Sequence, residues 1–505
     1  MDINEAFRSA YATLVSKPSS VLPFYLMSVS VPAVARVAPL LTGVFVYLAL
    51  LRRGSIDEIR SALDDVPLDE VGNAGGFEGM EETGEELAEL FDLILVPEVV
   101  AVIVLASVVF VVVVVALNAA VNAGQVGAVY GVLTGVEKPV DRGISSVFEH
   151  TSTFVLLFVA EAVAILVATA VLLGVGSVSV STGGILGAAL GLVVGLVWLA
   201  TVVGIHVFFV FAPQSVVVDG VGLRGALRGN LDFVTQNPAE FIAYLIFAFA
   251  ALIGFGSVAG FLNVLGAPAA VTVVGFVIFS PFVAVVKTDM YTRHAGEDVE
   301  DMDGSVDVHR VTGALREGLD ETRAFVTARP LLVVVSGLIF VGSAIGAWEA
   351  TQAAGVGIET SISNRLEGMS PVGEFFNYTA NNWAVGVAQS YAGFVFGVAT
   401  VVSLVFNGSL IGFLTATEAN LVELTAFIVP HGIIEIPALL ISGGLGLHLG
   451  GVGIGYVRGR VSAEEVADET RRAYRIFVGL LVLFGVAGFV EGFISPYYYG
   501  PLLGI

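Results

Sequence analysis

Residues 97–120 read PEVVAVIVLASVVFVVVVVALNAA, and this run decides the class of fold. After Glu98 it contains no charged side chain, and a membrane-spanning helix needs about 20 mostly apolar residues. Comparable stretches recur along the chain. The sequence therefore predicts an all-α, polytopic integral membrane protein with about eleven transmembrane helices, at 21–50, 97–120, 152–174, 185–212, 239–262, 267–286, 331–349, 383–405, 409–428, 432–456 and 476–495.

The composition excludes other classes of protein. The 505 residues are 56% hydrophobic and only 13% charged, whereas a soluble domain is about a quarter charged. The 60 glycines follow no G-X-Y period, which excludes collagen. Cysteine is absent, so a disulfide framework, a thiolate nucleophile and a zinc–sulfur site are all excluded. The N-terminus carries acidic residues and no apolar core, so we do not expect a signal peptide.

The charge is strongly acidic. Aspartate and glutamate total 45 against 22 lysines and arginines, which gives a net charge of −23. An acidic chain that is poor in lysine is typical of a halophilic archaeon, where molar salt screens the repulsion between carboxylates. We see no basic patch that could neutralise phosphates, so we expect no nucleic-acid partner. We expect membrane lipid to be the main partner of the apolar helices.

The basic residues predict the orientation, because they concentrate on the cytoplasmic side of a membrane protein. If 409–428 crosses fully, nearly all of them fall on one side, and the acidic segment 52–96 falls on the other. This distribution predicts a multi-pass plasma-membrane protein with its N-terminus in the cytoplasm and its C-terminus outside. The segment 409–428 is the weakest candidate, because it contains Glu418, Asn420 and Glu423, and a re-entrant segment is the alternative.

Two changes of composition predict the domain organisation. Residues 296–308 form an acidic linker between a six-span module, 1–295, and a five-span module, 309–505. Within the first module, 52–96 contains thirteen acidic residues and two stretches with helical spacing around GNAGGFEG. We expect an exposed acidic helical hairpin there, either simply solvated or used to dock a partner or a cation.

One local device recurs. At 12–18, 232–238 and 324–330, an amphipathic stretch precedes a proline that begins an apolar run. Proline is tolerated in the first helical turn, where its missing N–H has no intrahelical partner in any case. We therefore expect each amphipathic helix to lie at the membrane interface and each proline to begin the next span.

Ionisable residues inside predicted spans are the candidate functional residues, because such groups cost free energy in a membrane and tend to be paired or functional. His431 and Glu435 are four apart, so they share one helix face. With Glu491 and Glu423 they form a candidate polar membrane cluster. Two interpretations stay open: a proton, cation or headgroup site, or a latch that holds helices in register. A metal site is weaker, since the sequence places no third ligand, so we predict none.

Several small residues are expected to be structural. Asn407-Gly408 predicts the end of a helix and a tight turn, because glycine reaches positive φ without a steric penalty. The run GGLGLHLGGVGIG places glycines four apart, as at Gly446 and Gly450 or at Gly451 and Gly455, which lets helix backbones approach closely. A gap along a permeation path is the alternative use of these glycines.

The region 310–496 resembles the stage II sporulation protein M family. The ordered features are Ala-Arg-Pro at 328–330, Asn381-Asn382, Asn407-Gly408, the string PHGIIEIP at 430–437 with its Pro430, Gly432 and Pro437, the glycine-rich stretch and VEGF at 490–493. In sporulating bacteria the family member belongs to a membrane machine that holds peptidoglycan-degrading partners. The resemblance implies scaffolding, with envelope-associated proteins as partners, and no chemistry by the family protein itself.

Residues 1–295 resemble a six-span haloarchaeal membrane domain, similar to the membrane part of some glycerophosphodiester phosphodiesterases. The residues that carry this resemblance are Ala212-Pro213, the stretch 222–227 and Asn237-Pro238. We recognise no phosphodiesterase domain, P-loop, GxSxG elbow or HExxH helix. We therefore expect a non-enzymatic scaffold or assembly factor without a cofactor. The alternative is a transporter that uses the buried Glu and His residues, and an intramembrane lipid enzyme comes third.

Overall fold

The computed structural model describes residues 3–65, 84–355, 360–362 and 370–497. Helices make up nearly all of these ranges, and within them the pairing between Thr360 and Glu418 is an isolated bridge rather than a strand. The predicted all-α class is therefore confirmed. By its internal contacts the chain forms two compact units, Met1–Ala33 with Ala116–Ile505, and Val34–Val115. Each unit is described by itself.

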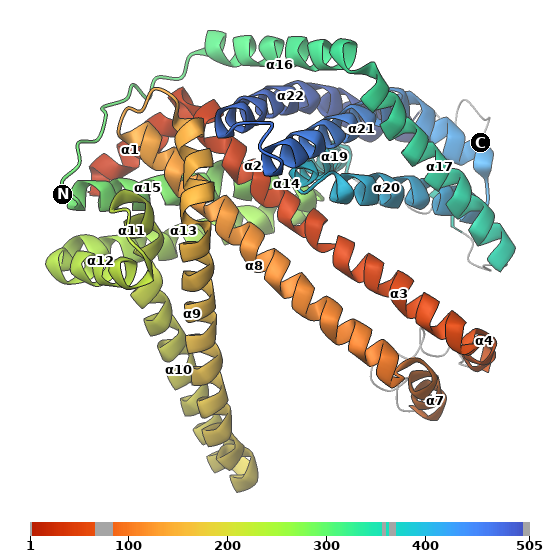
Figure 1. The fold of residues 1–505 in the computed structure, drawn as a ribbon, viewed down its shortest axis with the longest axis horizontal. Coiled ribbons are helices and arrows are strands. Elements are labelled where there is room, and N and C mark those ends of the chain that lie inside the picture. Colours follow the sequence, from red (N-terminus) through yellow and green to blue (C-terminus); the bar gives the residue numbers. More distant parts are fainter. Residues whose placement is uncertain (1–2, 66–83, 356–359, 363–369, 498–505) are drawn as a thin grey trace. The chain divides into compact units, whose positions relative to one another are not determined.

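Figure 1 shows the helices, coloured in chain order. Those before residue 296 are α1 (Ile3–Ser16), α2 (Pro18–Ala35), α3 (Val37–Arg53), α4 (Ile56–Asp65), α7 (Gly84–Ile94), α8 (Pro97–Leu133), α9 (Pro139–Thr182), α10 (Gly184–Phe209), α11 (Ala212–Val218), α12 (Leu223–Gln236), α13 (Pro238–Leu265), α14 (Pro268–Val274), the π-helix η1 (Gly275–Phe279) and α15 (Ser280–His294). After the irregular residues 297–307 come α16 (Val308–Ala328), α17 (Pro330–Ala354), α19 (Pro371–Tyr391), η2 (Ala392–Phe394), α20 (Val398–Thr417), α21 (Leu421–Val457), α22 (Ala463–Phe489) and the π-helix η3 (Val490–Ile494).

Ten segments of the described chain are long and apolar enough to cross a membrane. They are Pro18–Arg53, Pro97–Leu133, Pro139–Ser177, Gly184–Val218, Pro238–Leu265, Pro268–His294, Pro330–Ala354, Val398–Thr417, Leu421–Val457 and Ala463–Tyr497. The polytopic class is thus confirmed. Ten crossings return the C-terminus to the side of the N-terminus. The predicted external C-terminus therefore depends on α19 as an eleventh crossing, and it stays a prediction.

The predicted boundaries are wrong between 383 and 428. The stretch 383–405 runs across the end of α19 and the start of α20, and 409–428 runs across the end of α20 and the start of α21. Glu418 and Asn420 lie in the connection between those two helices rather than inside a span. The error arose because α19 carries asparagines and a glutamine, so its apolar signal is weak and the neighbouring runs were joined across a turn.

The device of a helix followed by a proline is confirmed at all three places. The helices α1, α12 and α16 end at Ser16, Gln236 and Ala328, and Pro18, Pro238 and Pro330 begin the long helices that follow. In each case the proline occupies the first turn, where no intrahelical hydrogen bond to its nitrogen is lost.

The outward faces of the long helices are apolar. Ile185 is 92% exposed, Val264 is 90% exposed and Leu173 is 69% exposed. Single exposed apolar residues are normal on soluble proteins, but here they recur along whole helices such as α9, α10 and α13. Such faces are stable against lipid, which agrees with the assignment as a multi-pass membrane protein.

The two predicted modules pack against each other within the larger unit. A shared core joins α2 and the ends of α8 and α9 to α21 and α22, with the buried residues Phe24, Ala128, Val140, Ile144, Val452, Val466 and Ala467. Two ion pairs reinforce it, because Arg471 lies 2.7 Å from Asp141 and Lys138 lies 2.6 Å from Glu464. The boundaries at 295 and 309 stay a prediction.

The smaller unit contains α3, α4, α7 and the first part of α8. The helices α4 and α7 pack together, and both are rich in acidic residues, as expected for 52–96. The stretch GNAGGFEG that was expected to join them lies outside the described residues. Arg53 at the end of α3 lies 3.4 Å from Glu98 at the start of α8, on the exposed surface.

Glycines allow close helix contacts in the C-terminal region, as predicted for Gly446 and Gly450, whereas a Cβ at Gly451, in the other predicted pair, would meet nothing within 4 Å. A Cβ at Gly446 would lie 2.5 Å from Thr400 Oγ1, and one at Gly450 would lie 2.7 Å from Gly397 N. The predicted turn at Asn407-Gly408 is wrong, because both residues lie inside α20. Gly408 instead brings α20 against α17, since a Cβ there would lie 2.2 Å from the carbonyl oxygen of Phe340.

Candidate functional site

Helix α21 presents His431 and Glu435 on one face, as their spacing predicts. It begins at Leu421, where the side chain of Asn420 accepts hydrogen bonds from two backbone N–H groups of the first turn. The span was expected to begin at residue 432, so that these two residues would lie near its start. The structure places them in the third and fourth turns of a helix of 37 residues.

Both prolines of the PHGIIEIP string lie inside α21, one before and one after the pair. A proline in a helix interior has no N–H to donate to the carbonyl four residues earlier and disturbs the helix locally. Pro437 therefore leaves the carbonyl of Ile433 without its usual intrahelical donor. The buried Gly432 lies between the prolines in the same stretch of helix. The string thus gives this part of α21 an irregular backbone beside its ionisable residues.

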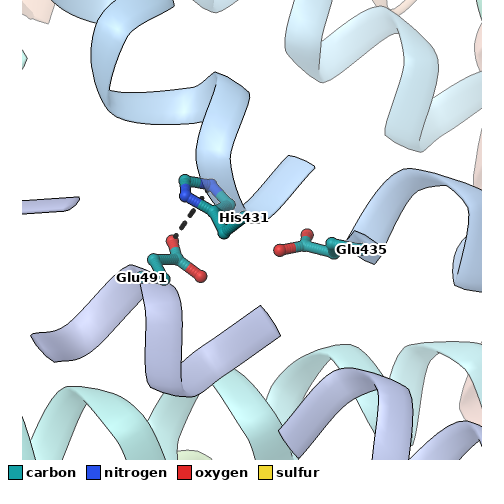
Figure 2. A group of neighbouring side chains, drawn as sticks. All are labelled: His431, Glu435 and Glu491. Atoms are coloured by element: carbon teal, nitrogen blue, oxygen red, sulfur yellow. Dashed lines mark ion pairs between the residues drawn. The ribbon is translucent and has the colours of Figure 1, made fainter. Parts of the chain in front are cut away.

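The third residue of the site comes from the other end of the C-terminal region. Glu491 lies in η3, a π-helical turn that continues α22 and packs against α21. Single π-helical turns are rare in proteins as a whole, but many of those that occur lie at functional sites. One ligand atom from each of His431, Glu435 and Glu491 lies within 4.8 Å of the others. Figure 2 shows the Glu435 carboxylate directed toward the other two side chains.

The closest contact in this cluster joins the imidazole and Glu491. His431 Nε2 lies 3.8 Å from Glu491 Oε1, which is an ion-pair distance rather than a hydrogen bond. The second oxygen of Glu491, Oε2, is buried and has no hydrogen-bond partner. His431 is 5% exposed and Glu491 is 8% exposed. A buried carboxylate oxygen without a donor is costly, so this arrangement calls for a proton or a cation.

The charge balance of the cluster points the same way. Two carboxylates lie within 4.8 Å of each other, and repulsion between like charges is strong where water is excluded. Among the residues that the structure describes, no lysine or arginine forms an ion pair with Glu435 or Glu491. Among the described residues that form ion pairs in this cluster, the His431 imidazole is thus the basic group that could offset the negative charge of the two carboxylates.

Neighbouring residues complete the surroundings. His431 Nδ1 lies 3.3 Å from Ser495 Oγ, and the His431 ring stands edge-on to Phe427 with centroids 5.3 Å apart. Helix α19, which carries Glu374 and Tyr378, packs against η3. None of these residues was predicted from the sequence. Ser495 is four residues after Glu491, and this helical spacing was the available signal, whereas nothing in the sequence pointed to α19.

Glu423, the fourth predicted member, lies elsewhere. It belongs to the first turn of α21, where Asn420 Nδ2 donates to its Oε1 at 2.8 Å. Eight residues separate it from His431, and this corresponds to about 12 Å along a helix. The structure thus brings together three of the four predicted residues, and Glu423 takes part in the cap of the helix.

Two other ionisable residues of the long helices contact an oppositely charged type of side chain on a neighbouring helix. Glu161 on α9 lies 2.9 Å from His206 on α10. His448, further along α21, lies 3.0 Å from Glu469 on α22, and Arg329 lies 3.8 Å from the same carboxylate. In each of these contacts one carboxylate faces a histidine, whereas His431 lies beside two carboxylates.

Comparison with known proteins identifies the region that contains this cluster. Residues 333–496 match the family model described as Stage II sporulation protein M. A stretch of 128 residues is 30% identical to an uncharacterized protein of Methanocaldococcus jannaschii, and it covers 24% of this chain and 72% of that protein. No solved structure matches the chain. His431, Glu435, Glu491 and Ser495 all lie inside the region matched by the family model.

Proposed function

Because the chain belongs to the stage II sporulation protein M family through residues 333–496, we propose that it is a non-enzymatic scaffold or assembly factor of the cell envelope. The role that the family resemblance implies is to hold other envelope proteins in place. Such a role requires a stable membrane body and surfaces for partners, and it requires no catalytic group. Envelope-associated proteins and membrane lipid are the proposed partners.

The observation that carries this proposal is how the family region is built into the larger unit. Its helices α21 and α22 share a buried core with α2, α8 and α9. The ion pairs of Arg471 with Asp141 and of Lys138 with Glu464 join parts of the chain more than 300 residues apart. A body fixed in this way suits a component that positions partners.

The remaining parts of the proposal rest on sequence. The resemblance of residues 1–295 to a haloarchaeal membrane domain rests on Ala212-Pro213, the stretch 222–227 and Asn237-Pro238. The acidic, lysine-poor composition supports a halophilic source. The basic residues support insertion in the plasma membrane with the N-terminus in the cytoplasm.

A transporter or permease is the second candidate function. The observation that favours it is the set of buried His431, partly buried Glu435 and buried Glu491, which has no lysine or arginine partner in the described structure. Buried ionisable residues in membrane helices often mark an ion or proton path. A transporter would use these side chains in every cycle, whereas a scaffold would need them only for stability.

Crosslinking and purification from native membranes in high salt tests the scaffold proposal. Tagged wild type and tagged Glu435→Gln are compared, with partner recovery expressed per molecule of tagged protein. A scaffold recovers the same reproducible partners in both samples, even if the variant is less abundant. The absence of any reproducible partner of the wild type contradicts the scaffold. Loss of solute flux by a normally abundant Glu435→Gln protein supports the transporter.

A further inference from the structure

We propose that His431, Glu435 and Glu491 bind one divalent transition-metal ion, of the class of Zn²⁺ or Mn²⁺, between α21 and η3. This inference concerns a binding site and does not depend on the scaffold role. It also replaces the expectation of no metal, which arose because the sequence places only two ligands four residues apart. The fold supplies the third ligand from a position 56 residues after Glu435.

The donor set fits such an ion. One imidazole nitrogen and two carboxylates are common ligands of zinc and manganese, whereas calcium and magnesium prefer sites made of oxygen alone. Metal–ligand bonds of about 2.0–2.2 Å place neighbouring ligand atoms about 3.5 Å apart. The observed 3.8 Å between His431 Nε2 and Glu491 Oε1, and the 4.8 Å limit for the whole set, need only small side-chain movements to reach that geometry.

A buried carboxylate oxygen without a donor points to a ligand independently of the cluster. Glu491 is 8% exposed, and its Oε2 is buried with no hydrogen-bond partner. Figure 2 shows one oxygen of this carboxylate facing His431 and the other directed toward the side of Glu435. A cation between the three side chains would give this oxygen a partner and offset the repulsion between the two carboxylates.

The surroundings of His431 also fit metal binding. In protein metal sites, the ring nitrogen that does not bind the metal usually contacts an oxygen, which fixes the orientation of the ring. Here Nδ1 lies 3.3 Å from Ser495 Oγ, while Nε2 faces Glu491. When Nδ1 donates a hydrogen bond to the serine hydroxyl, Nε2 is unprotonated and its lone pair faces the proposed ion.

The backbone positions the ligands on two separate elements. Pro430 and Pro437 flank the two ligands on α21, and the π-helical turn carries Glu491. An ion held by both elements joins α21 to the end of α22, so metal binding stabilises the C-terminal region. Water completes the coordination, since three protein ligands leave a position open.

The full-length protein, purified in detergent at high salt and stripped with a chelator, tests this site. Equilibrium dialysis against Zn²⁺ or Mn²⁺, followed by elemental analysis, gives stoichiometry and affinity. We expect one ion per chain in wild type and in Glu423→Gln, the matched control on the same helix. Glu491→Gln is expected to bind at least about 100-fold more weakly, and Ser495→Ala about 10–100-fold more weakly. Added metal should raise the midpoint of thermal unfolding of wild type and of the control Glu423→Gln, but not that of Glu491→Gln.

Two results would overturn the proposal. Failure of the stripped wild-type protein to take up one equivalent of either ion does so without any variant. Wild-type affinity in a folded Glu491→Gln protein, judged by circular dichroism and gel filtration, does so as well. If that variant does not fold, Ser495→Ala decides in its place, because it leaves all three ligands present and its affinity must still fall. Partner recovery by wild type is a separate measurement, so failure of the scaffold and failure of the metal site are distinguishable.

Discussion

Substitution of Gly479 by alanine should separate α16 from α22. A Cβ at Gly479 would lie 2.3 Å from the carbonyl oxygen of Gly318 and 2.4 Å from Thr322 Oγ1, whereas ordinary contacts are 3.4–4 Å. The backbones would have to move apart by about 1.1 Å, the difference between 3.4 and 2.3 Å. Overpacking of this kind costs about 1–3 kcal/mol, and alanine in place of glycine returns about 0.5–1 kcal/mol of helix propensity. The expected net loss is about 0–2.5 kcal/mol.

Gly485 on the same helix provides the matched control. A Cβ there meets nothing within 4 Å, so Gly485→Ala gains helix propensity without a clash and should be neutral or stabilising by up to about 1 kcal/mol. Thermal unfolding of the two variants and the wild type in detergent, followed by circular dichroism, measures the difference. Equal stability of Gly479→Ala and Gly485→Ala would refute the close contact between α16 and α22.

Three further predictions concern contacts inside the larger unit. A double-mutant cycle of Asp141→Asn and Arg471→Gln should show a coupling of about 0.5–1 kcal/mol in unfolding experiments, because the 2.7 Å ion pair is partly buried, and additive losses would contradict it. The hydrogen bond and charge of Glu464 raise the pKa of Lys138, so the stability contributed by this pair should persist below the ordinary lysine pKa of 10.5 and disappear as the pH rises above it. The thermal midpoints of wild type and Lys138→Gln should therefore converge as the pH rises through the raised pKa of Lys138, and a difference that grows there would exclude the pair as its source. Trp383 donates a 2.8 Å hydrogen bond to a backbone carbonyl of α22, and Trp383→Phe should lower the unfolding free energy by about 1–3 kcal/mol, whereas an unchanged midpoint would show that the bond contributes nothing.

The sequence predicted most of the helices because their signals are local. Apolar runs reveal spans, and Pro238 and Pro330 mark where two of them begin. The prediction failed where local signals conflict. The helix α19 carries Asn377, Asn381, Asn382 and Gln389, so its apolar signal is weak. As a result, the predicted spans 383–405 and 409–428 do not match the helix ends in the structure.

The candidate site was only partly predictable for a related reason. The pair of His431 and Glu435 follows from helical periodicity alone. Glu491 joins them through a tertiary contact between α21 and η3, and a sequence without an alignment gives no register for such a contact. Glu423 lies on the same helix as His431, but it belongs to the first turn of that helix, where Asn420 donates a hydrogen bond to it. The turn expected at Asn407-Gly408 failed because glycine also serves close helix packing, which only the neighbouring α17 reveals.

The proposed role as a scaffold is tested most directly by complementation of a gene deletion. Wild type, His431→Ala and Glu435→Gln are expressed in the deletion strain, and growth and cell shape are compared with the amount of each protein in the membrane. We predict that complementation follows protein amount, because these side chains hold the C-terminal region together. A variant that is present at the wild-type level yet fails to restore growth would contradict the scaffold and show that the cluster itself performs the function.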